Sequence, residues 1–327
     1  MREVLLAPAL LLLVGLLVLA SLTLGYLELS PLAWWRGVWA GDPLLRLVLV
    51  EIRLPRTLLA LAVGAALGVA GAALQSLLRN PLAEPALVGA TGGASLGAVM
   101  ALYWGWAGAW SLALPLAGFA GAALVTAFVL LLALRGASTV GLILAGVAAS
   151  SLSTALVSLI LNASPNPHAT MEIVHWLLGS VTDRSLQDVA LVLPPIALGM
   201  ALLLRQGTAL RRLVLDEEAA ASLGVSLPRL RLAVLVGAAL AVGAATAIAG
   251  SIGFVGLVAP HLVRPLVRHD PARTLWASMG AGAVLLLAAD LAVRLIDPHG
   301  AELKLGVLTA LVGAPFFLWR VLAVRAP

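Results

Sequence analysis

GSIGFVGLVAPHLVR, from Gly250 to Arg264, is almost wholly apolar, yet three glycines and one proline interrupt it within fifteen residues. A helix that only fills a membrane needs no such interruptions, because glycine and proline both weaken helices. The glycines recur every three residues, which predicts a helix face that admits a neighbouring backbone. Pro260 is expected to disturb the helix near one membrane face, where His261 and Arg264 would reach water or lipid headgroups. The stretch therefore predicts a short, closely packed membrane helix.

The composition of the whole chain supports a membrane protein. Of 327 residues, 62% are hydrophobic and 11% are charged, and the mean hydropathy is +1.08. A soluble globule cannot cover its surface with so few polar groups. The predicted fold is all-α and polytopic, with about ten membrane-spanning helices and a single permease domain over 1–327. The apolar runs cover 4–27, 57–78, 86–104, 111–134, 140–161, 189–204, 232–249, 251–267, 274–296 and 303–322. The segment 170–180 is too short and polar to span and predicts an interfacial helix.

Several kinds of chemistry are excluded or disfavoured by residue type. The absence of cysteine removes thiolate metal sites, disulfides and thiol nucleophiles. The single lysine, Lys304, does not follow a glycine-rich loop, so the chain has no phosphate cradle for nucleotide hydrolysis. The net charge of +5 comes from arginines scattered between apolar runs, which does not indicate nucleic-acid binding. We expect no cofactor and no metal.

The distribution of basic residues predicts the orientation in the membrane. With ten helices and the N-terminus inside, 13 arginines fall on the cytoplasmic side, and 7 arginines and lysines fall outside. By the positive-inside rule, both termini are predicted to lie in the cytoplasm.

Two polar regions stand out from the apolar runs. Leu210–Val234 holds acidic residues, a helix-forming AAASL, Gly224 as a candidate C-terminal cap and Pro228 opening another element. The simplest interpretation is two short helices joined by a tight turn, and a solvated loop is the alternative. Residues 53–99 place Arg53 and Arg56 at the outer end of a span and NPLAEP, Asn80–Pro85, at the inner end. The arginines could simply extend to the interface, and NPLAEP could be a plain loop.

Charged and metal-binding residue types are scarce inside the spans. Asp290 and Arg294 lie four residues apart on one helix, and we expect an internal ion pair that spares the membrane two bare charges. His175 and His261 are candidates for haem ligation, but the first lies in the outer interfacial segment and the second near the inner face. They are not expected to form one buried axial site.

Five motifs, in order and with matching spacing, carry a resemblance to a known family. They are RLPR, GAALGVAGAALQSLLRNPLAEPALVGATGGA, DEEAAASLG, AGSIGFVGLVAPHLVR and ELKLGVLTALVGAPFFLWRVL. Together they resemble the permease subunit of ABC importers for iron–siderophore, haem and cobalamin, the FecCD-type or cobalamin-importer-like family. The likeness runs from about residue 20 to the C-terminus. It implies the type II ABC importer permease fold and a homodimer with two ATP-binding cassette subunits, fed by a periplasmic binding protein.

The resemblance also implies roles for individual residues. Arg53, Arg56 and Arg294 match positions that dock the binding protein. The cytoplasmic gate is expected at Asn80, Leu82, Thr139 and Val140, although Val140 departs from the small polar residue of some members. The segment 207–230 matches the part that couples to the ATPase, with these residues at its centre: Asp216, Glu217, Glu218, Ala219, Ala220, Leu223 and Gly224.

We therefore expect a permease subunit, not an enzyme, in the bacterial inner membrane, carrying an iron chelate (a ferric siderophore or haem) driven by a separate ATPase. A cobalamin importer of the same family is the alternative. An ion-coupled secondary transporter is a rival class, but it usually carries mid-membrane acids, and only Asp290 is a candidate. An intramembrane enzyme would need a paired catalytic set, and the spans contain no such pattern.

Overall fold

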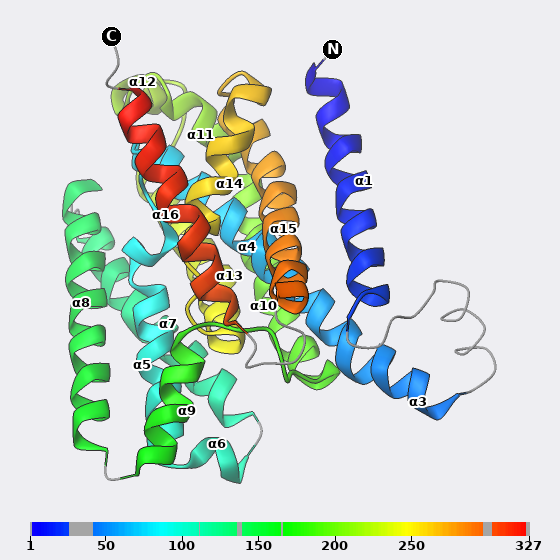
Figure 1. The fold of residues 1–327 in the computed structure, drawn as a ribbon. Helices are drawn as coiled ribbons and strands as arrows, with labels where there is room; N and C mark the ends of the chain where they lie inside the picture. Colours follow the sequence, from blue (N-terminus) through cyan, green and yellow to red (C-terminus); the bar gives the residue numbers. More distant parts are fainter. Residues whose placement is uncertain are drawn as a thin grey trace.

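The computed structural model describes residues 2–25, 42–110, 112–135, 139–164, 166–296 and 303–324. Over these ranges the chain consists of helices and their connections, with no strand (Figure 1). Seven helical segments are long and apolar enough to cross a membrane, and three shorter apolar helices accompany them. The prediction of an all-α bundle with about ten spans is confirmed.

The long apolar helices and the three shorter ones are distributed along the whole described chain. They are α1 (Arg2–Thr23), α4 (Leu54–Leu77), α5 (Ala90–Tyr103), α7 (Ala113–Leu134), α8 (Thr139–Ala163), α10 (Leu186–Arg205), α13 (Leu227–Ala249), α14 (Val255–Val263), α15 (Pro271–Ile296) and α16 (Leu305–Val324). The start of α1, the end of α16 and helices α11 and α12 lie at one end of the bundle, which we call the α12 end (Figure 1).

Short helical elements connect or extend the spans. The π-helix η1 (Leu47–Arg53) joins α3 (Pro43–Arg46) to α4 without a break. The others are η2 (Pro85–Val88), α6 (Trp106–Ala109), α9 (Pro167–Leu177), α11 (Gly207–Leu213), α12 (Glu217–Ser222) and η3 (Arg264–Val267). Helix α9 corresponds to the short helix predicted at 170–180, shifted by three residues.

Helix α4 forms the centre of the bundle, where α15, α13, α14 and α10 pack around it. The backbones approach closely because glycines face one another. A Cβ added to Gly64 would overlap the carbonyl oxygen of Gly282, and one added to Gly71 would overlap that of Gly256. Small residues permit such contacts where the hydrophobic effect gives little drive for helix association in lipid. The glycines of α4 therefore serve close helix packing.

The stretch from Gly250 to Arg264 differs in part from its prediction. Gly250 adopts a φ of +70° and ends α13, and α14 begins only at Val255. The glycines at 250, 253 and 256 therefore do not line one helix face, because the first two precede the helix. Gly256 does admit a neighbour, since a Cβ there would lie 3.0 Å from the carbonyl oxygen of Leu67. The prediction of a short, closely packed helix is confirmed.

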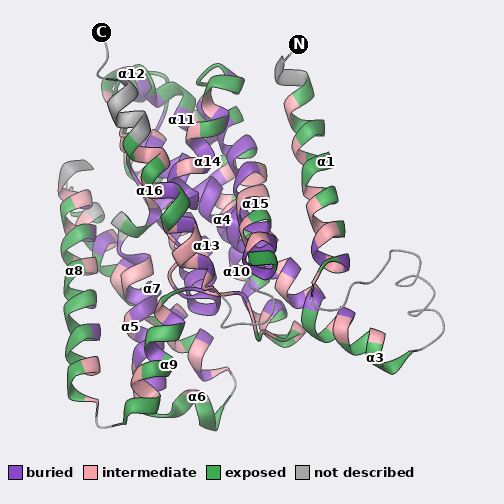
Figure 2. Cartoon of the chain, in the orientation of Figure 1, coloured by how far each residue is buried: buried purple, intermediate pink, exposed green. Residues whose placement is uncertain are grey.

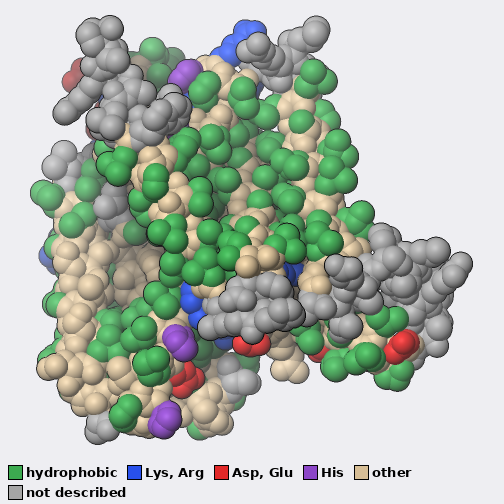
Figure 3. All heavy atoms as spheres, viewed as in Figure 1, with side chains coloured by type: hydrophobic (Ala, Val, Ile, Leu, Met, Phe, Trp, Pro, Cys, Tyr) green, Lys and Arg blue, Asp and Glu red, His purple; other side chains and the backbone are tan. Residues whose placement is uncertain are grey.

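Helices α1, α8 and α16 lie at the edge of the bundle and expose much of their surface, whereas α4 and α13 are mostly buried (Figure 2). Many of their outward side chains are large and apolar, as Leu11, Leu152 and Leu311 show. Hydrophobic side chains cover most of the bundle face in Figure 3, while acidic and histidine side chains lie toward its upper and lower ends. Lipid or a protein partner must cover such a surface.

Candidate functional site

A cluster of charged residues ties the C-terminal end of α1 to α4 and α15. We call Arg53, Arg56, Asp290 and Arg294 the arginine cluster. Arg53 is 5% exposed and donates from one guanidinium nitrogen to the carbonyl oxygens of Leu22 and Thr23, each at 2.8 Å. Carbonyls in the last turn of a helix lack partners within the helix, so a guanidinium there satisfies them and opposes the helix dipole.

Asp290 joins the other two arginines of the cluster. Arg56 Nε donates to Asp290 Oδ1 at 2.8 Å, and Arg294 pairs with the second carboxylate oxygen. Asp290 is 1% exposed and Arg294 is 6% exposed. Arg294 also donates to the carbonyl oxygen of Ser21 at 2.9 Å. The predicted pair of Asp290 and Arg294 is confirmed, and its link to Arg56 is a contact that sequence spacing did not indicate.

Two roles were considered for the arginines of the cluster: extension to the membrane interface and docking of a binding protein. Side chains that extend to the interface keep their charged ends in water, whereas Arg53 and Arg294 are buried and bonded to backbone carbonyls. Arg56 keeps a little more exposure, at 11% of its side chain. Arg53 and Arg294 therefore hold the C-terminal end of α1 in place.

The predicted gate falls on the connection between α4 and α5. Asn80 Oδ1 accepts a hydrogen bond from the backbone N–H of Leu82 at 2.9 Å, which closes a tight turn, and the side chain of Leu82 is 51% exposed. Thr139 is the first residue of α8. The side chains of Thr139 and Val140 lie outside the described residues, so the four predicted gate positions are not all placed.

Glu84, in the same connection, contacts a distant part of the chain. Its Oε1 accepts from the backbone N–H of Phe254 at 2.7 Å, directly before α14 begins. Phe254 has a φ of +66°, and the carboxylate satisfies a donor at a helix N-terminus, where negative charge is favoured. Burial raises the pKa of Glu84, while this hydrogen bond opposes the rise. The prediction did not single out Glu84, although the quoted NPLAEP motif contains it.

Helix α8 carries hydroxyl groups on an outward face. Ser151, Thr154 and Ser158 are exposed. With Ser150 and Ala86, they line a hollow of about 520 Å³ beside the gate connection. Ser150 Oγ donates to the carbonyl oxygen of Ala86 at 3.1 Å. Thr154 Oγ1 and Ser158 Oγ donate to the carbonyl oxygens of Ser150 and Thr154, at 3.0 and 2.9 Å, so these two hydroxyl groups are satisfied within α8.

The predicted coupling segment forms a short capped helix at the α12 end. Asp216 is the N-cap of α12, and its side chain accepts from the N–H of Ala219 at 2.5 Å. Gly224 follows the helix with a φ of +83°, as the cap prediction required. Glu217 pairs with Arg231 at 2.9 Å, and Ala220 is fully buried. The segment does hold two short helices, α11 and α12, but Pro228 opens the 23-residue span α13 and not a short helix.

This segment exposes apolar side chains as well as charges. Val214, Leu215 and Leu223 are 61%, 67% and 51% exposed. They lie beside the exposed acids Asp216 and Glu218. Apolar groups with a polar rim, fixed on a capped helix, are typical of a protein-binding surface.

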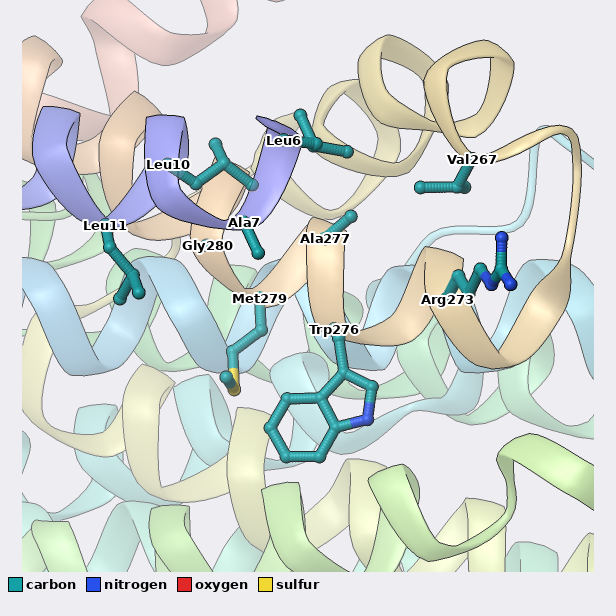
Figure 4. Close-up of a pocket in the computed structure, with 10 residues that line it drawn as sticks. All are labelled: Leu6, Ala7, Leu10, Leu11, Val267, Arg273, Trp276, Ala277, Met279 and Gly280. Atoms are coloured by element: carbon teal, nitrogen blue, oxygen red, sulfur yellow. The ribbon is translucent and has the colours of Figure 1, made fainter. Parts of the chain in front are cut away.

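Another hollow lies at the edge of the bundle, between α1 and α15 (Figure 4). Its volume is about 590 Å³, and nine of its ten lining residues are apolar, with Arg273 as the exception. Leu10 and Leu11 of α1 face Met279 and Gly280 of α15 across it. It opens beside exposed leucines of α1, at the outer surface of the bundle.

No metal site is found in the part of the chain that the structure describes, where no three His, Asp or Glu side chains come together. His261 lies on α14 and packs edge-on against Phe316, with 6.1 Å between the ring centroids. His175 lies on α9. Arg264, which was predicted to reach water or lipid headgroups, is half-buried and donates to Gln75 Oε1 at 2.6 Å.

Comparisons with known proteins agree with this architecture. Residues 11–323 match the sequence profile of the FecCD transport family. The Fe(3+) dicitrate permease FecD of Escherichia coli is 36% identical, over 89% of this chain and 91% of its own. The vitamin B12 permease BtuC of Vibrio cholerae is 39% identical, over 91% and 88%. The molybdate permease MolB of Haemophilus influenzae is 36% identical, over 91% and 89%.

A solved structure has the same fold. It is an ABC transporter described as of the metal-chelate type, in an inward-facing conformation. It aligns with a TM-score of 0.85 and 35% identity, over 94% of this chain and 96% of the other. With a family profile covering nearly the whole sequence and relatives above 30% identity over most of their length, the chain belongs to the FecCD transport family of ABC transporter permeases.

Proposed function

We propose that this chain is the permease subunit of an ABC importer that carries an iron chelate, a ferric siderophore or haem, across the bacterial inner membrane. It does not hydrolyse ATP itself; a separate ATPase subunit drives it. The observation that carries the proposal is the capped helix α12 with its exposed apolar neighbours, Val214, Leu215 and Leu223. A rigid cytoplasmic helix can pass a rigid-body change from a closing ATPase to the membrane helices.

The proposed assembly is a homodimer with two ATP-binding cassette subunits. Both termini and α12 would face the cytoplasm, in accord with their common end of the bundle (Figure 1). The hydroxyl-bearing face of α8 would line the path opposite a second copy, with Asn80 and Leu82 near its cytoplasmic end. Thr139 and Val140 complete the proposed gate.

A periplasmic binding protein would dock on the opposite end, near Arg53, Arg56 and Arg294. Rim charges steer an encounter more than they fix affinity. Because Arg53 and Arg294 are buried, Arg56 is the member best placed to meet an acidic partner.

The cargo is proposed from the printed functions of relatives. Two probable iron chelatin permeases of Helicobacter pylori are 36% and 35% identical to this chain, alongside FecD. Cobalamin is the second candidate because BtuC of Vibrio cholerae is 39% identical to this chain. The residues proposed to line the path do not indicate which of these cargoes is carried. A wall lined by hydroxyl groups, without strong ligands, would bind each cargo weakly and permit its release.

The test is uptake into proteoliposomes that contain the permease, the ATPase and the binding protein. We expect ATP-dependent uptake of a ferric chelate, and loss of uptake when Asp216, Glu217 and Glu218 are replaced by arginine. Uptake that continues without ATP, or that survives this triple replacement, would overturn the proposal. Uptake of cobalamin but not of ferric chelates would select the second cargo.

A further inference from the structure

A second polar cavity lies where three connections meet at the α12 end. It has a volume of about 310 Å³ and lies among the end of α4, the gate connection, the residue after α11, and the connection from η3 to α15. The polar residues that line it are Gln75, Ser76, Arg79, Arg264, His269 and Thr274. Among the described residues that line it, none is acidic.

The buried amide in this cavity lacks a partner for its donor group. Gln75 is 3% exposed, and its Oε1 accepts from Arg264 at 2.6 Å. That bond fixes the amide orientation, because a flipped amide would set a donor against a donor. Its Nε2 then has no hydrogen-bond partner among the described residues. A buried donor without a partner is costly, and an anion or water that satisfies it is the ordinary explanation.

The charged groups around Gln75 are also donors. Arg264 bonds only the neutral Gln75, and Arg79 donates to the carbonyl oxygen of Leu213 at 2.9 Å. Neither arginine forms an ion pair within the described ranges. The nearby acid Asp270 is held by Arg211 at 2.8 Å instead. Arg79 and His269 have positive φ angles of 48° and 60°, conformations that tertiary contacts must maintain.

We propose that this cavity binds a phosphate-class oxyanion, held by Gln75 Nε2 and the guanidinium groups of Arg79 and Arg264. Arginine donors match phosphate oxygens in geometry and charge, and an amide N–H adds a neutral donor. The oxyanion is either the headgroup of an anionic phospholipid or free phosphate. In either case it lies between the gate connection and Val214, the residue that follows α11.

The test uses the full-length protein in neutral detergent. In one arm, thermal unfolding is followed in phosphate and in chloride at equal ionic strength. In the other, native mass spectrometry measures retention of phosphatidylglycerol against phosphatidylcholine. Arg264→Gln is expected to weaken binding of the responding ligand about tenfold or more, as the loss of a charged hydrogen bond implies. Arg205→Gln, at the exposed end of α10, is the matched control and should change nothing.

A second variant keeps the test valid if Arg264→Gln folds poorly. Gln75→Glu has nearly the same shape and gives Arg264 a permanent carboxylate. It should unfold at or above the wild-type temperature and lose the ligand response. A response to phosphate alone identifies free phosphate, and selective retention of phosphatidylglycerol identifies a lipid headgroup. No response in either arm, or equal losses in Arg205→Gln, would overturn the proposal.

Discussion

At the end of α1 and α15, the charged side chains of the arginine cluster are buried and bonded to one another and to backbone carbonyls. At the α12 end, Asp216, Glu218 and Leu223 are exposed around a short capped helix. Buried charges are costly to break and suit a structural role, whereas exposed groups on a rigid helix suit contact with a partner. The comparison predicts that mutations in the cluster lower stability, and that mutations in the coupling segment lower transport.

The largest effect is expected for Asp290→Ala. The change removes the carboxylate that accepts from Arg56 and Arg294 and leaves both guanidinium groups in a buried site. Breaking a buried ion pair by removing one partner costs about 3–5 kcal/mol. Thermal unfolding of the purified protein should show a large drop in midpoint. Glu218→Gln, which removes an exposed carboxylate, should stay within about 0.5 kcal/mol. Similar midpoints for the two variants would contradict the contrast between the ends.

The next largest effect is expected at the α12 end, and it is measured as transport and not as stability. Leu223→Asp places a charge on a side chain that is 51% exposed beside α12. If an ATPase covers this surface, a buried unpaired charge should reduce ATP-driven uptake at least about tenfold. The unfolding midpoint should not change. Leu223→Asn introduces a side chain with the shape of aspartate but without its charge, and this variant should lose less uptake. A fall in stability with intact uptake would show that the segment serves only the fold.

Local features of the two ends could be predicted from the sequence, whereas contacts between distant positions could not. Hydropathy located the spans, and the spacing of Asp290 and Arg294 predicted their pair, because both are local patterns. The bond from Arg56 to Asp290 crosses 234 positions and that from Glu84 to Phe254 crosses 170, so neither has a local signature. Periodicity also misplaced Gly250 on a helix face, because the positive φ that ends α13 depends on its packing against Gly179 and Trp176.

A smaller and more local effect is expected for Asp216→Ala. The side chain caps α12 by accepting from Ala219, and loss of an N-cap costs about 1 kcal/mol. Because α12 has one buried residue, we expect the helix to loosen without unfolding the bundle. Hydrogen exchange over 217–222 should become about fivefold faster. Asp216→Asn, which keeps a capping oxygen, should exchange at nearly the wild-type rate. Unchanged exchange in the alanine variant would mean that the cap does not order the coupling surface.

The smallest effect is expected for Glu84. Its carboxyl group is partly buried, and it lies in the same connection as the exposed gate residue Leu82. Burial raises its pKa above the ordinary value of 4.5, despite the hydrogen bond from Phe254. The folded protein therefore binds this proton more tightly than the unfolded chain does. Stability from this group is complete below pH 4.5 and is lost as the pH rises through the folded pKa. Glu84→Gln keeps an acceptor oxygen but cannot titrate. Its unfolding midpoint should lack this decline, so that wild type and variant differ least in acid and most at neutral pH. A wild type that gains stability relative to the variant as the pH rises would contradict this expectation. It would mean that the charged carboxylate is the better cap for α14, and that the charge of Glu84 is stabilised as the charges of the arginine cluster are.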